Sequence, residues 1–310
     1  MSVNVLFSAR PALWQDYEGP LQTALRKAGV DARIARDFAP EQVDYIVFAP
    51  NGPVRDFRPF TRCKAVLGLW AGVENIVGNE TLTQPLARMV DPGLKEGMRD
   101  WVAGHVLRHH LGMDADICRQ DAHWVEHTPP LARDRPIGFL GLGELGSYCA
   151  QALTGLGFPV VGWSRSPKQV DGVSTFSGPD GIGQVLRRAE ILVLLLPLTG
   201  DTENILNADT LRQMPQGAVV INPGRGALID DDALLDALNS GRIGYATLDV
   251  FRKEPLPQDH PFWAHPRVTV TPHIASATRP DTASEVIAEN IRRGEAGAPF
   301  LHLVDRDAGY

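Results

Sequence analysis

The sequence predicts an α/β protein made of two doubly wound parallel sheets, each covered by helices. Short apolar runs alternate with amphipathic stretches almost throughout the chain, which is the pattern of buried parallel strands joined by helical crossovers. A turn-rich stretch at residues 128–136 separates a first series of such units from a second one. The length of 310 residues fits two domains of ~150 residues each.

The first hundred residues predict a small α/β domain. Residues 14–28 predict a helix, because Leu21, Leu25 and Ala28 recur on one face and Gly29 follows where a C-cap glycine stands. A cluster of turn formers, Pro50-Asn51-Gly52-Pro53, interrupts the pattern. Strands are expected at residues 3–7, 32–35, 45–49 and 65–70.

A second series follows a long helix expected at residues 95–111. A last helix, at about 281–293, returns to the first domain, so we expect discontinuous domains: 1–98 with 282–310, and 99–281. The crossings between them are expected at residues 95–111 and 276–281, with a cleft between the domains. The expected strands are 137–140, 160–163, 191–196, 218–222, 245–248 and 268–271, and the expected helices are 145–156, 182–189 and 230–238.

Composition excludes some classes of function. The chain has 30 Lys and Arg against 37 Asp and Glu, a formal charge of −7. This balance argues against a dedicated binder of nucleic acid or of anionic membranes. It still allows a local basic pocket for an anionic ligand. The longest strongly apolar run, residues 191–198, is far below the ~20 residues that cross a bilayer. Cys63, Cys118 and Cys149 form no disulfide framework, so we expect buried thiols and a cytoplasmic protein.

Residues 137–146 combine an apolar strand, a GxGxxG pattern and the start of an amphipathic helix. Such glycines alone mark only a tight loop, but between a strand and a helix they predict a Rossmann domain that binds a dinucleotide. Gly141 permits the tight turn, Gly143 lets the backbone approach a pyrophosphate, and Gly146 lets the helix pack closely on the sheet. The N–H groups at the helix start then hold the pyrophosphate.

The end of the next strand indicates which dinucleotide binds. NAD-binding domains place Asp or Glu there, ~20 residues after the glycines, to accept hydrogen bonds from the ribose hydroxyls. This chain instead has Ser164, Arg165 and Ser166. Arg165 can pair with a 2′-phosphate that a carboxylate would repel. The sequence therefore predicts NADP(H) as the preferred cofactor, with NAD(H) possible; the alternative is an ordinary solvated basic turn.

Three segments after later strands carry Arg225, Glu254 and His273. Ligands of open parallel sheets bind beyond the carboxyl ends of the strands, so these residues are expected near the reacting end of the cofactor. Reduction of a 2-oxo acid needs a cation for the carboxylate, a proton donor for the nascent alkoxide and a group that positions the donor. Arg225, His273 and Glu254 suit these three tasks in that order. A single Arg, Glu or His at a strand end is more often structural than catalytic: Arg225 can pair with Asp249, and Glu254 can bond a loop amide.

The segments INPGRGALID, LDVFRKEPLP and VTVTPHIASAT, with the glycine loop, resemble the D-isomer-specific 2-hydroxyacid dehydrogenases from about residue 65 to the C-terminus. The turn 163–166, the pair 123–124 and the ending 304–310 are most similar to a short, NADPH-preferring branch, the bacterial glyoxylate/hydroxypyruvate reductases. The resemblance implies a flavodoxin-like substrate domain, hydride transfer from NADPH to a small 2-oxo acid such as glyoxylate or hydroxypyruvate, and a homodimer formed through the dinucleotide-binding domain.

The resemblance also implies further contacts. The loop that begins at Ala71 is similar to the family's substrate-carboxylate loop, Asp249 would contact the nicotinamide carboxamide, and Trp124 would reach the neighbouring subunit's substrate pocket. One departure is Pro223-Gly224 before Arg225, where relatives usually carry Thr, Ala or Ser followed by Ala or Ser. The expected cofactor contacts are Gly141, Gly143, Glu144, Leu145, Gly146, Ser164, Arg165, Ser166, Leu196, Pro197, Asn222, Pro223 and Asp249, and the expected substrate contacts are Trp70, Ala71, Gly72, Val73, Trp124, Arg225 and His273.

Four other histidines are expected to stand outside the chemistry. His105 and His109 have an i, i+4 spacing that can bind a metal, but no third ligand accompanies them, so we expect surface or hinge residues and no metal site. His260 and His265 lie in a Pro-rich loop and are expected to be solvated or to bond loop amides.

Two other functions stay open. The first is reduction of bulkier 2-oxo acids such as 2-oxoisocaproate or phenylpyruvate. It stays open because the size of the substrate pocket is set by loops whose positions the sequence does not give. The second is a nucleotide-sensing regulator on the same fold. The complete set of Arg225, Glu254 and His273 argues against the regulator.

Overall fold

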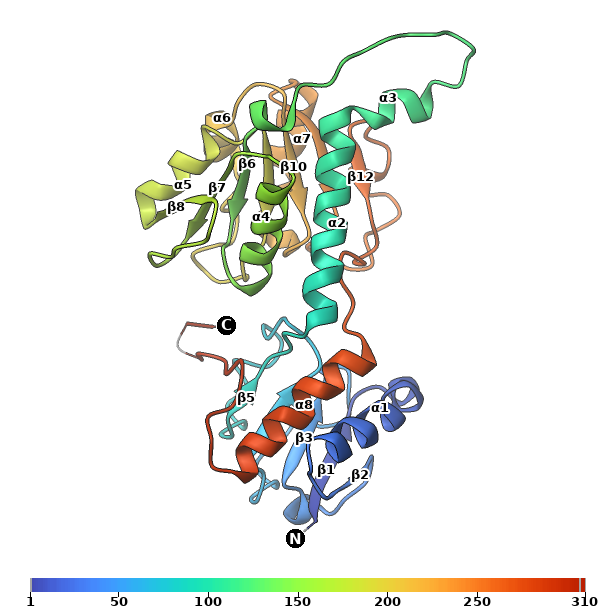
Figure 1. The fold of residues 1–310 in the computed structure, drawn as a ribbon, viewed down its shortest axis with the longest axis vertical. Coiled ribbons are helices and arrows are strands. Elements are labelled where there is room, and N and C mark those ends of the chain that lie inside the picture. Colours follow the sequence, from blue (N-terminus) through green and yellow to red (C-terminus); the bar gives the residue numbers. More distant parts are fainter. Residues whose placement is uncertain (1, 307, 310) are drawn as a thin grey trace. The chain divides into compact units, whose positions relative to one another are not determined.

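The computed structural model describes residues 2–306, 308 and 309, and it divides into two compact units (Figure 1). Unit 1 consists of Met1–Leu94 and Ala277–Tyr310, and unit 2 consists of Lys95–Ser276. The boundaries lie a few residues before those expected from the sequence. Each unit contains one sheet whose paired strands are all parallel, so the predicted α/β fold class is confirmed.

Unit 1 is built on five strands in the order β2-β1-β3-β4-β5, which is the flavodoxin-like order. Helices α1 (Trp14–Lys27) and α8 (Pro280–Glu295) pack against each other and bury Leu21 and Ile287 against strand residues such as Val5. The strands are β1 (Val3–Ser8), β2 (Ala32–Ala35), β3 (Tyr45–Phe48), β4 (Ala65–Gly68) and β5 (Leu86–Ala87).

The C-terminal segment closes the β5 edge of this sheet. Val304 N–H donates to the Leu86 carbonyl at 2.8 Å, and Arg88 N–H donates to the His302 carbonyl at 3.0 Å. The edge strand is thereby partly covered rather than left open for other chains. Within the ending that carries part of the family resemblance, residues 307 and 310 lie outside the described residues.

Unit 2 is built on seven strands in the order β12-β11-β10-β9-β6-β7-β8. Apart from the added β12, this is the Rossmann order, which reverses between β6 and β9 and binds ligands in the crevice at that point. The strands are β6 (Ile137–Leu140), β7 (Val160–Ser164), β8 (Val173–Ser177), β9 (Ile191–Leu194), β10 (Ala218–Asn222), β11 (Ile243–Leu248) and β12 (Val268–Val270), and the helices are α2 (Pro92–Leu111), α3 (Met113–Cys118), α4 (Glu144–Gly155), α5 (Pro179–Leu186), α6 (Ala208–Gln213) and α7 (Asp231–Asn239).

Helices cover both faces of the unit 2 sheet, which explains why its central strands are buried along their whole length and mostly apolar. Every residue of β9 and β10 is buried. Val106 of α2 and Leu153 of α4 pack on one face, and Val185 of α5 and Leu234 of α7 pack on the other. The sheet is therefore a rigid base for the loops at its carboxyl edge.

Most of the expected elements are present, and β2, β6 and β10 have the predicted bounds. Cys63 and Cys149 are buried, and burial raises the pKa of each thiol to about 12. The expectation for Cys118 is wrong: it is exposed, because α3 buries none of its residues. Among the described helices, none is long and apolar enough to span a membrane.

Candidate active site

The glycine loop joins β6 to α4 at the point where the strand order of unit 2 reverses. Gly141 has a φ of +105°, and a Cβ there would stand 2.4 Å from the Leu195 carbonyl oxygen, so only glycine fits. A Cβ at Gly146 would lie 1.9 Å from the Gly141 oxygen. Gly143 is the N-cap of α4, offers no side chain to it, and has no atom within 4 Å of an added Cβ. The helix start thus has the open space that a pyrophosphate needs.

Two glycine variants are expected to separate folding from cofactor binding. Gly146→Ala should destabilise the protein by about 1–3 kcal/mol, because its Cβ would overlap a backbone oxygen. Gly143→Ala should fold normally but bind the dinucleotide at least about tenfold more weakly, because its methyl group would occupy the pyrophosphate's place. Thermal unfolding, measured with and without NADP⁺, reports both effects. Unchanged cofactor binding by Gly143→Ala would contradict the role of the loop.

The turn after β7 lies beside the glycine loop, since Gly141 N–H donates to the Trp163 carbonyl at 2.9 Å. The Ser164 hydroxyl donates to the Ser166 carbonyl at 2.8 Å and folds the turn. The side chains of Arg165 and Ser166 are exposed. A guanidinium and a hydroxyl therefore stand at the strand end where NAD-binding domains carry a carboxylate.

Arg225 follows β10 in a turn that Asn222 supports from the buried side. The Asn222 amide donates to the Arg225 carbonyl at 2.9 Å, and its oxygen accepts from Gly224 N–H at 3.1 Å. The half-buried Arg225 guanidinium donates to the Gly224 carbonyl at 2.7 Å. At Gly226 an added Cβ would lie 2.1 Å from the Phe251 carbonyl carbon. This close approach brings the Arg225 turn next to the segment that follows β11.

Asp249 follows β11 and organises the segment after β12. Its fully buried carboxylate accepts from the Thr271 hydroxyl at 2.6 Å, from Ile274 N–H at 2.9 Å and from Ala275 N–H at 2.8 Å. Its backbone carbonyl accepts from His273 N–H at 2.8 Å. Asp249 therefore holds the segment that carries His273 from both sides, while its expected contact with a nicotinamide carboxamide stays a prediction.

His273 and Glu254 are joined by a hydrogen bond of 2.7 Å between Nδ1 and Oε2. The other Glu254 oxygen accepts from Phe251 N–H at 2.9 Å, so Glu254 bonds a loop amide and the histidine at once. His273 has a φ of +55°, an uncommon conformation for a non-glycine residue that recurs at functional sites. Its side chain is 54% exposed. Because Nδ1 is engaged, Nε2 is the atom that can exchange a proton with a ligand.

The loop expected to bind the substrate carboxylate lies in unit 1, directly after β4. Met89 N–H donates to the Trp70 carbonyl at 2.9 Å where the loop begins, and Ile76 N–H donates to the Val73 carbonyl at 2.9 Å where it ends. In the described part of the chain, no acceptor binds the N–H groups of Gly72 and Val73. Trp70 is 39% exposed, so it is not packed in the core. Two donors and an indole ring are thus available to a ligand.

Trp124 lies in a segment that projects from unit 2. The chain from α3 onward extends away from the body of the unit before it returns to β6 (Figure 1). Trp124 is 91% exposed, and its indole N–H is 3.4 Å from the Glu126 carboxylate. The exposed large apolar residues of this segment are Met113, Ile117, Trp124, Val125 and Leu131.

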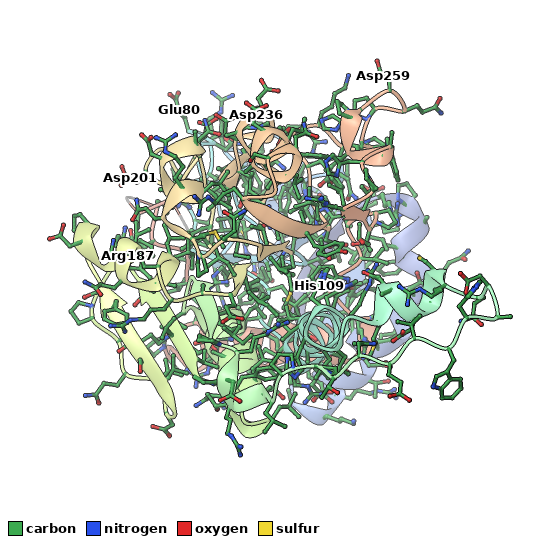
Figure 2. The ribbon with its side chains drawn as sticks, turned by 90° about the horizontal axis from the view of Figure 1, so that it is seen from above. Glu80, His109, Arg187, Asp201, Asp236 and Asp259 are labelled. Atoms are coloured by element: carbon green, nitrogen blue, oxygen red, sulfur yellow. The ribbon has the colours of Figure 1, made fainter. Side chains whose placement is uncertain are left out.

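The expectation that His105 and His109 are surface or hinge residues is wrong. His109, labelled in Figure 2, lies on the sheet side of α2, with Nε2 2.8 Å from the Thr247 hydroxyl of β11. Burial lowers the pKa of His109 to about 4. It also lowers the pKa of His105, whose ring packs on Trp101 with centroids 4.3 Å apart. Among the described residues, no three His, Cys, Asp or Glu side chains gather in a way that could hold a metal.

The two loop histidines behave as predicted. His260 Nδ1 accepts from Phe262 N–H at 3.3 Å, and His265 Nδ1 accepts from Arg267 N–H at 3.2 Å. Both are therefore explained by local loop structure, in contrast to His273, whose ring is aligned by a carboxylate.

Comparison with known sequences identifies relatives of most of the chain. Residues 103–275 match the family model described as D-isomer specific 2-hydroxyacid dehydrogenase, NAD binding domain. The glyoxylate/hydroxypyruvate reductase A of Serratia proteamaculans is 44% identical over 257 residues, which cover 80% of this chain and 82% of that protein. The protein of the same name from Yersinia enterocolitica is 42% identical over 255 residues, with the same coverage.

Solved structures with the same fold include cofactor complexes. A D-isomer specific 2-hydroxyacid dehydrogenase from Xanthobacter autotrophicus, in complex with NADPH and MES, superposes with a TM-score of 0.93 at 40% identity, covering 100% of both chains. An NADPH-dependent glyoxylate/hydroxypyruvate reductase from Sinorhizobium meliloti, in complex with NADP and sulfate, superposes with a TM-score of 0.84 at 33% identity, again covering 100% of both chains.

Proposed function

Because the chain belongs to the D-isomer specific 2-hydroxyacid dehydrogenases, we propose that it reduces small 2-oxo acids, glyoxylate and hydroxypyruvate among them, with NADPH. The observation that carries this proposal is the hydrogen bond between His273 Nδ1 and Glu254 Oε2. It supplies an oriented proton donor at the carboxyl edge of the sheet that also carries the glycine loop. The names of the relatives support the two substrates.

Three side chains of unit 2 have separate roles in the reaction: Arg225, His273 and Glu254. Arg225 binds the carboxylate and the carbonyl oxygen with its planar guanidinium, and it stabilises the negative charge that develops on that oxygen. His273 donates a proton to the same oxygen from Nε2. Glu254 keeps the imidazole in position through Nδ1. When bound, NADPH supplies the hydride from C4 of its nicotinamide ring.

We assign unit 2 as the dinucleotide-binding domain and unit 1 as the substrate-binding domain. Unit 2 has the Rossmann strand order and the glycine loop, and it contains the whole of the matched family segment. In unit 1, the N–H groups of Gly72 and Val73 are the proposed donors to the substrate carboxylate, and Trp70 is the proposed apolar wall beside them. Backbone N–H groups bind carboxylates in this way without a buried counter-charge.

The residues of unit 2 fit NADP(H), with NAD(H) possible as a second cofactor. The start of α4 has open space at Gly143 and no side-chain cap, as a pyrophosphate requires. The turn after β7 offers Arg165 in place of an acid. Relatives of the same fold are described in complex with NADPH or NADP, which supports the same choice here.

Arg165→Ala is expected to lower the preference for NADPH. The ratio of kcat/KM for NADPH to that for NADH should fall by about tenfold or more, because a charge-assisted bond to the 2′-phosphate is lost. Arg187→Ala removes another exposed arginine of unit 2, directly after α5 rather than in the turn, and should leave the ratio unchanged. A wild-type enzyme that prefers NADH would contradict the prediction.

We further propose a cytoplasmic homodimer formed through unit 2. The apolar side chains exposed on α3 and the chain after it are more than a monomer usually leaves in one segment, and a second copy would cover them. Ile117→Asp, in this segment, is expected to convert a dimer of 33.8 kDa chains into monomers. Sedimentation velocity measures the change. A wild-type protein that sediments as a monomer would contradict the proposal.

A panel of 2-oxo acids tests the substrate assignment. NADPH oxidation should be fastest, judged by kcat/KM, with glyoxylate and hydroxypyruvate. Higher values for 2-oxoisocaproate or phenylpyruvate would favour the alternative reductase of bulkier acids. No turnover with any acid, combined with tight NADPH binding, would favour the nucleotide-sensing regulator.

A further inference from the structure

The loop of residues 250–255, which carries Glu254, leaves β11 with little support from the backbone. In the described part of the chain, no backbone N–H or carbonyl group of this loop bonds to another backbone group. Phe251 packs on the core of the unit, and its N–H donates to the Glu254 side chain at 2.9 Å. Beyond Phe251, the position of the Glu254 carboxylate therefore depends on the side chains that hold the loop.

Arg252 joins this loop to two other segments of unit 2. Its Nη2 donates to the Ile229 carbonyl at 2.7 Å and to the side-chain oxygen of Asn204. Its Nη1 lies 3.4 Å from a Glu203 carboxylate oxygen, and its Nε lies 4.0 Å from an Asp231 carboxylate oxygen. A planar guanidinium presents its donors in fixed directions, which suits a residue that bonds several acceptors at once. The Arg252 side chain is 34% exposed, so it is largely packed against these partners.

The two segments that Arg252 contacts are themselves paired with each other. Asn204 N–H donates to the Ala227 carbonyl at 2.9 Å, and Leu206 N–H donates to the Leu228 carbonyl at 3.0 Å. Leu206 and Leu228 are buried in the core of unit 2. The acceptors of Arg252 thus belong to a fixed part of the unit, whereas its backbone belongs to the loop that carries the glutamate.

We propose that Arg252 is a positioning residue that fixes this loop so that Glu254 can align His273 for proton transfer. Arg252 acts through Glu254, whose two oxygens accept from Phe251 N–H and bond His273 Nδ1. A displacement of this carboxylate would turn the imidazole, and a misplacement of about 1 Å can cost an enzyme about 10²-fold in rate. The inference rests on the proposed reductase activity, in which His273 is the proton donor.

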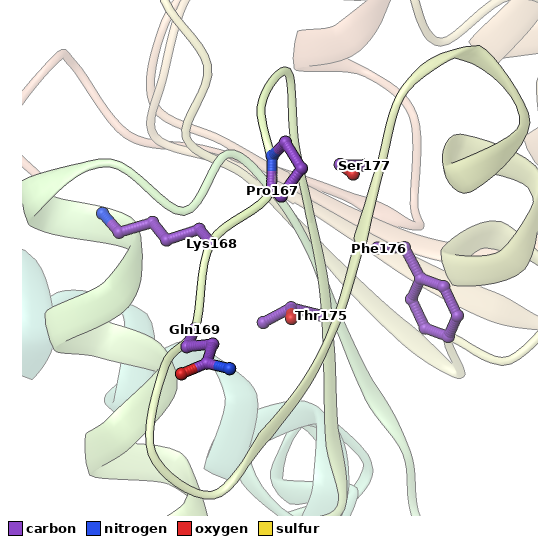
Figure 3. Close-up of a pocket in the computed structure, with 6 residues that line it drawn as sticks. All are labelled: Pro167, Lys168, Gln169, Thr175, Phe176 and Ser177. Carbon is purple, nitrogen blue, oxygen red and sulfur yellow. The ribbon is translucent and has the colours of Figure 1, made fainter.

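Arg252 stands apart from the turn that is expected to bind the cofactor. A pocket of about 290 Å³ beside that turn is lined by residues such as Lys168, Gln169 and Phe176, and Arg252 is not among its lining residues (Figure 3). In the sheet, β11 is separated from β7 by the three strands β10, β9 and β6. Loss of Arg252 should therefore leave the affinity for NADP⁺ within about twofold of wild type.

Arg252→Met removes the guanidinium and keeps most of the aliphatic stem. With NADPH and glyoxylate, its kcat should fall by about 10- to 100-fold, while both KM values stay within about twofold of wild type. Arg252→Lys keeps the charge and one donor to a carbonyl, so it should lose only about three- to fivefold in kcat. The matched control is Arg267→Met, because Arg267 also donates to a backbone carbonyl of unit 2, that of Leu238 at 3.1 Å, and should keep wild-type kcat.

A Glu254→Gln background separates positioning from a general structural role. There Arg252→Met should lower kcat by less than about a further twofold, because the carboxylate that Arg252 positions is already gone. If thermal unfolding shows that Arg252→Met is not folded, Arg252→Lys serves for the same comparison. The proposal would be overturned by an unchanged kcat in the folded variant, or by a loss of kcat that is equally large with and without the Glu254 carboxylate.

Nitrogen NMR of the histidine rings tests the same alignment without any substrate. The Nδ1 signal of His273, assigned by its loss in His273→Ala, should shift in Arg252→Met or Arg252→Lys toward its position in Glu254→Gln. An unshifted signal would overturn the proposal. A shifted signal in a protein whose wild type reduces no 2-oxo acid would contradict the proposed function and leave the positioning by Arg252 standing.

Discussion

Replacing His273 with alanine is expected to lower kcat for glyoxylate by about 10³-fold, within the range that a positioned general acid contributes. The variant loses the proton donor that Glu254 aligns at 2.7 Å. Affinity for NADP⁺ should stay within about twofold of wild type, because His273 lies after β12 and outside both the glycine loop and the turn after β7. Steady-state kinetics and a fluorescence titration of the cofactor measure the two quantities.

The matched control is His265→Ala. His265 lies just before β12, and among the described residues its ring accepts a hydrogen bond only from the local Arg267 N–H. This variant should keep kcat within about twofold of wild type, because the lost loop hydrogen bond contributes modestly to stability and takes no part in the reaction. If His273→Ala retained more than about a tenth of wild-type kcat, another group would have to be the proton donor.

Arg225→Lys is expected to lower kcat/KM by about 10²–10³-fold although it keeps the positive charge. An ammonium group cannot span a carboxylate and a carbonyl oxygen as a guanidinium does. The turn that presents Arg225 is fixed by the two hydrogen bonds of the Asn222 side chain. The backbone therefore cannot move to compensate for the shorter side chain of a lysine. Both a lower kcat and a higher KM for glyoxylate should result.

Arg212→Lys is the corresponding control. Arg212 is exposed on α6 and pairs with Asp209 on the same helix, so the substitution should leave kcat/KM unchanged. Thermal unfolding should show that both variants are folded. Wild-type kcat/KM in Arg225→Lys would mean that the substrate carboxylate is bound elsewhere.

The order of strands and helices is readable in the sequence because central parallel strands are buried on both faces. Residues 191–194 and 218–222 are continuous apolar or buried runs for this reason. The edge strand β8, Val173–Ser177, escaped prediction because it is partly polar and pairs on one side only. Helix α6 has six residues, and its one signal is the capping box of Asn207 and Thr210.

The candidate site is predictable where chemistry and strand ends coincide. Arg225, Glu254 and His273 stand out because charged or titratable residues follow apolar strands in order. Contacts that depend on how a loop folds back could not be predicted. The hydrogen bond from Lys168 to Leu142 joins residues 26 positions apart, and no periodic pattern in the sequence predicts it. The burial of His109 likewise depends on which face α2 turns to β11.

Transfer of deuterium from NADPH labelled at the reacting C4 position to hydroxypyruvate tests the central claim most directly. The protein should give D-glycerate that carries one deuterium at C2, as seen by mass spectrometry and NMR, because hydride passes to the carbonyl carbon and His273 protonates the oxygen. Glycerate without deuterium at C2, product of the L configuration, or no product at all would contradict it.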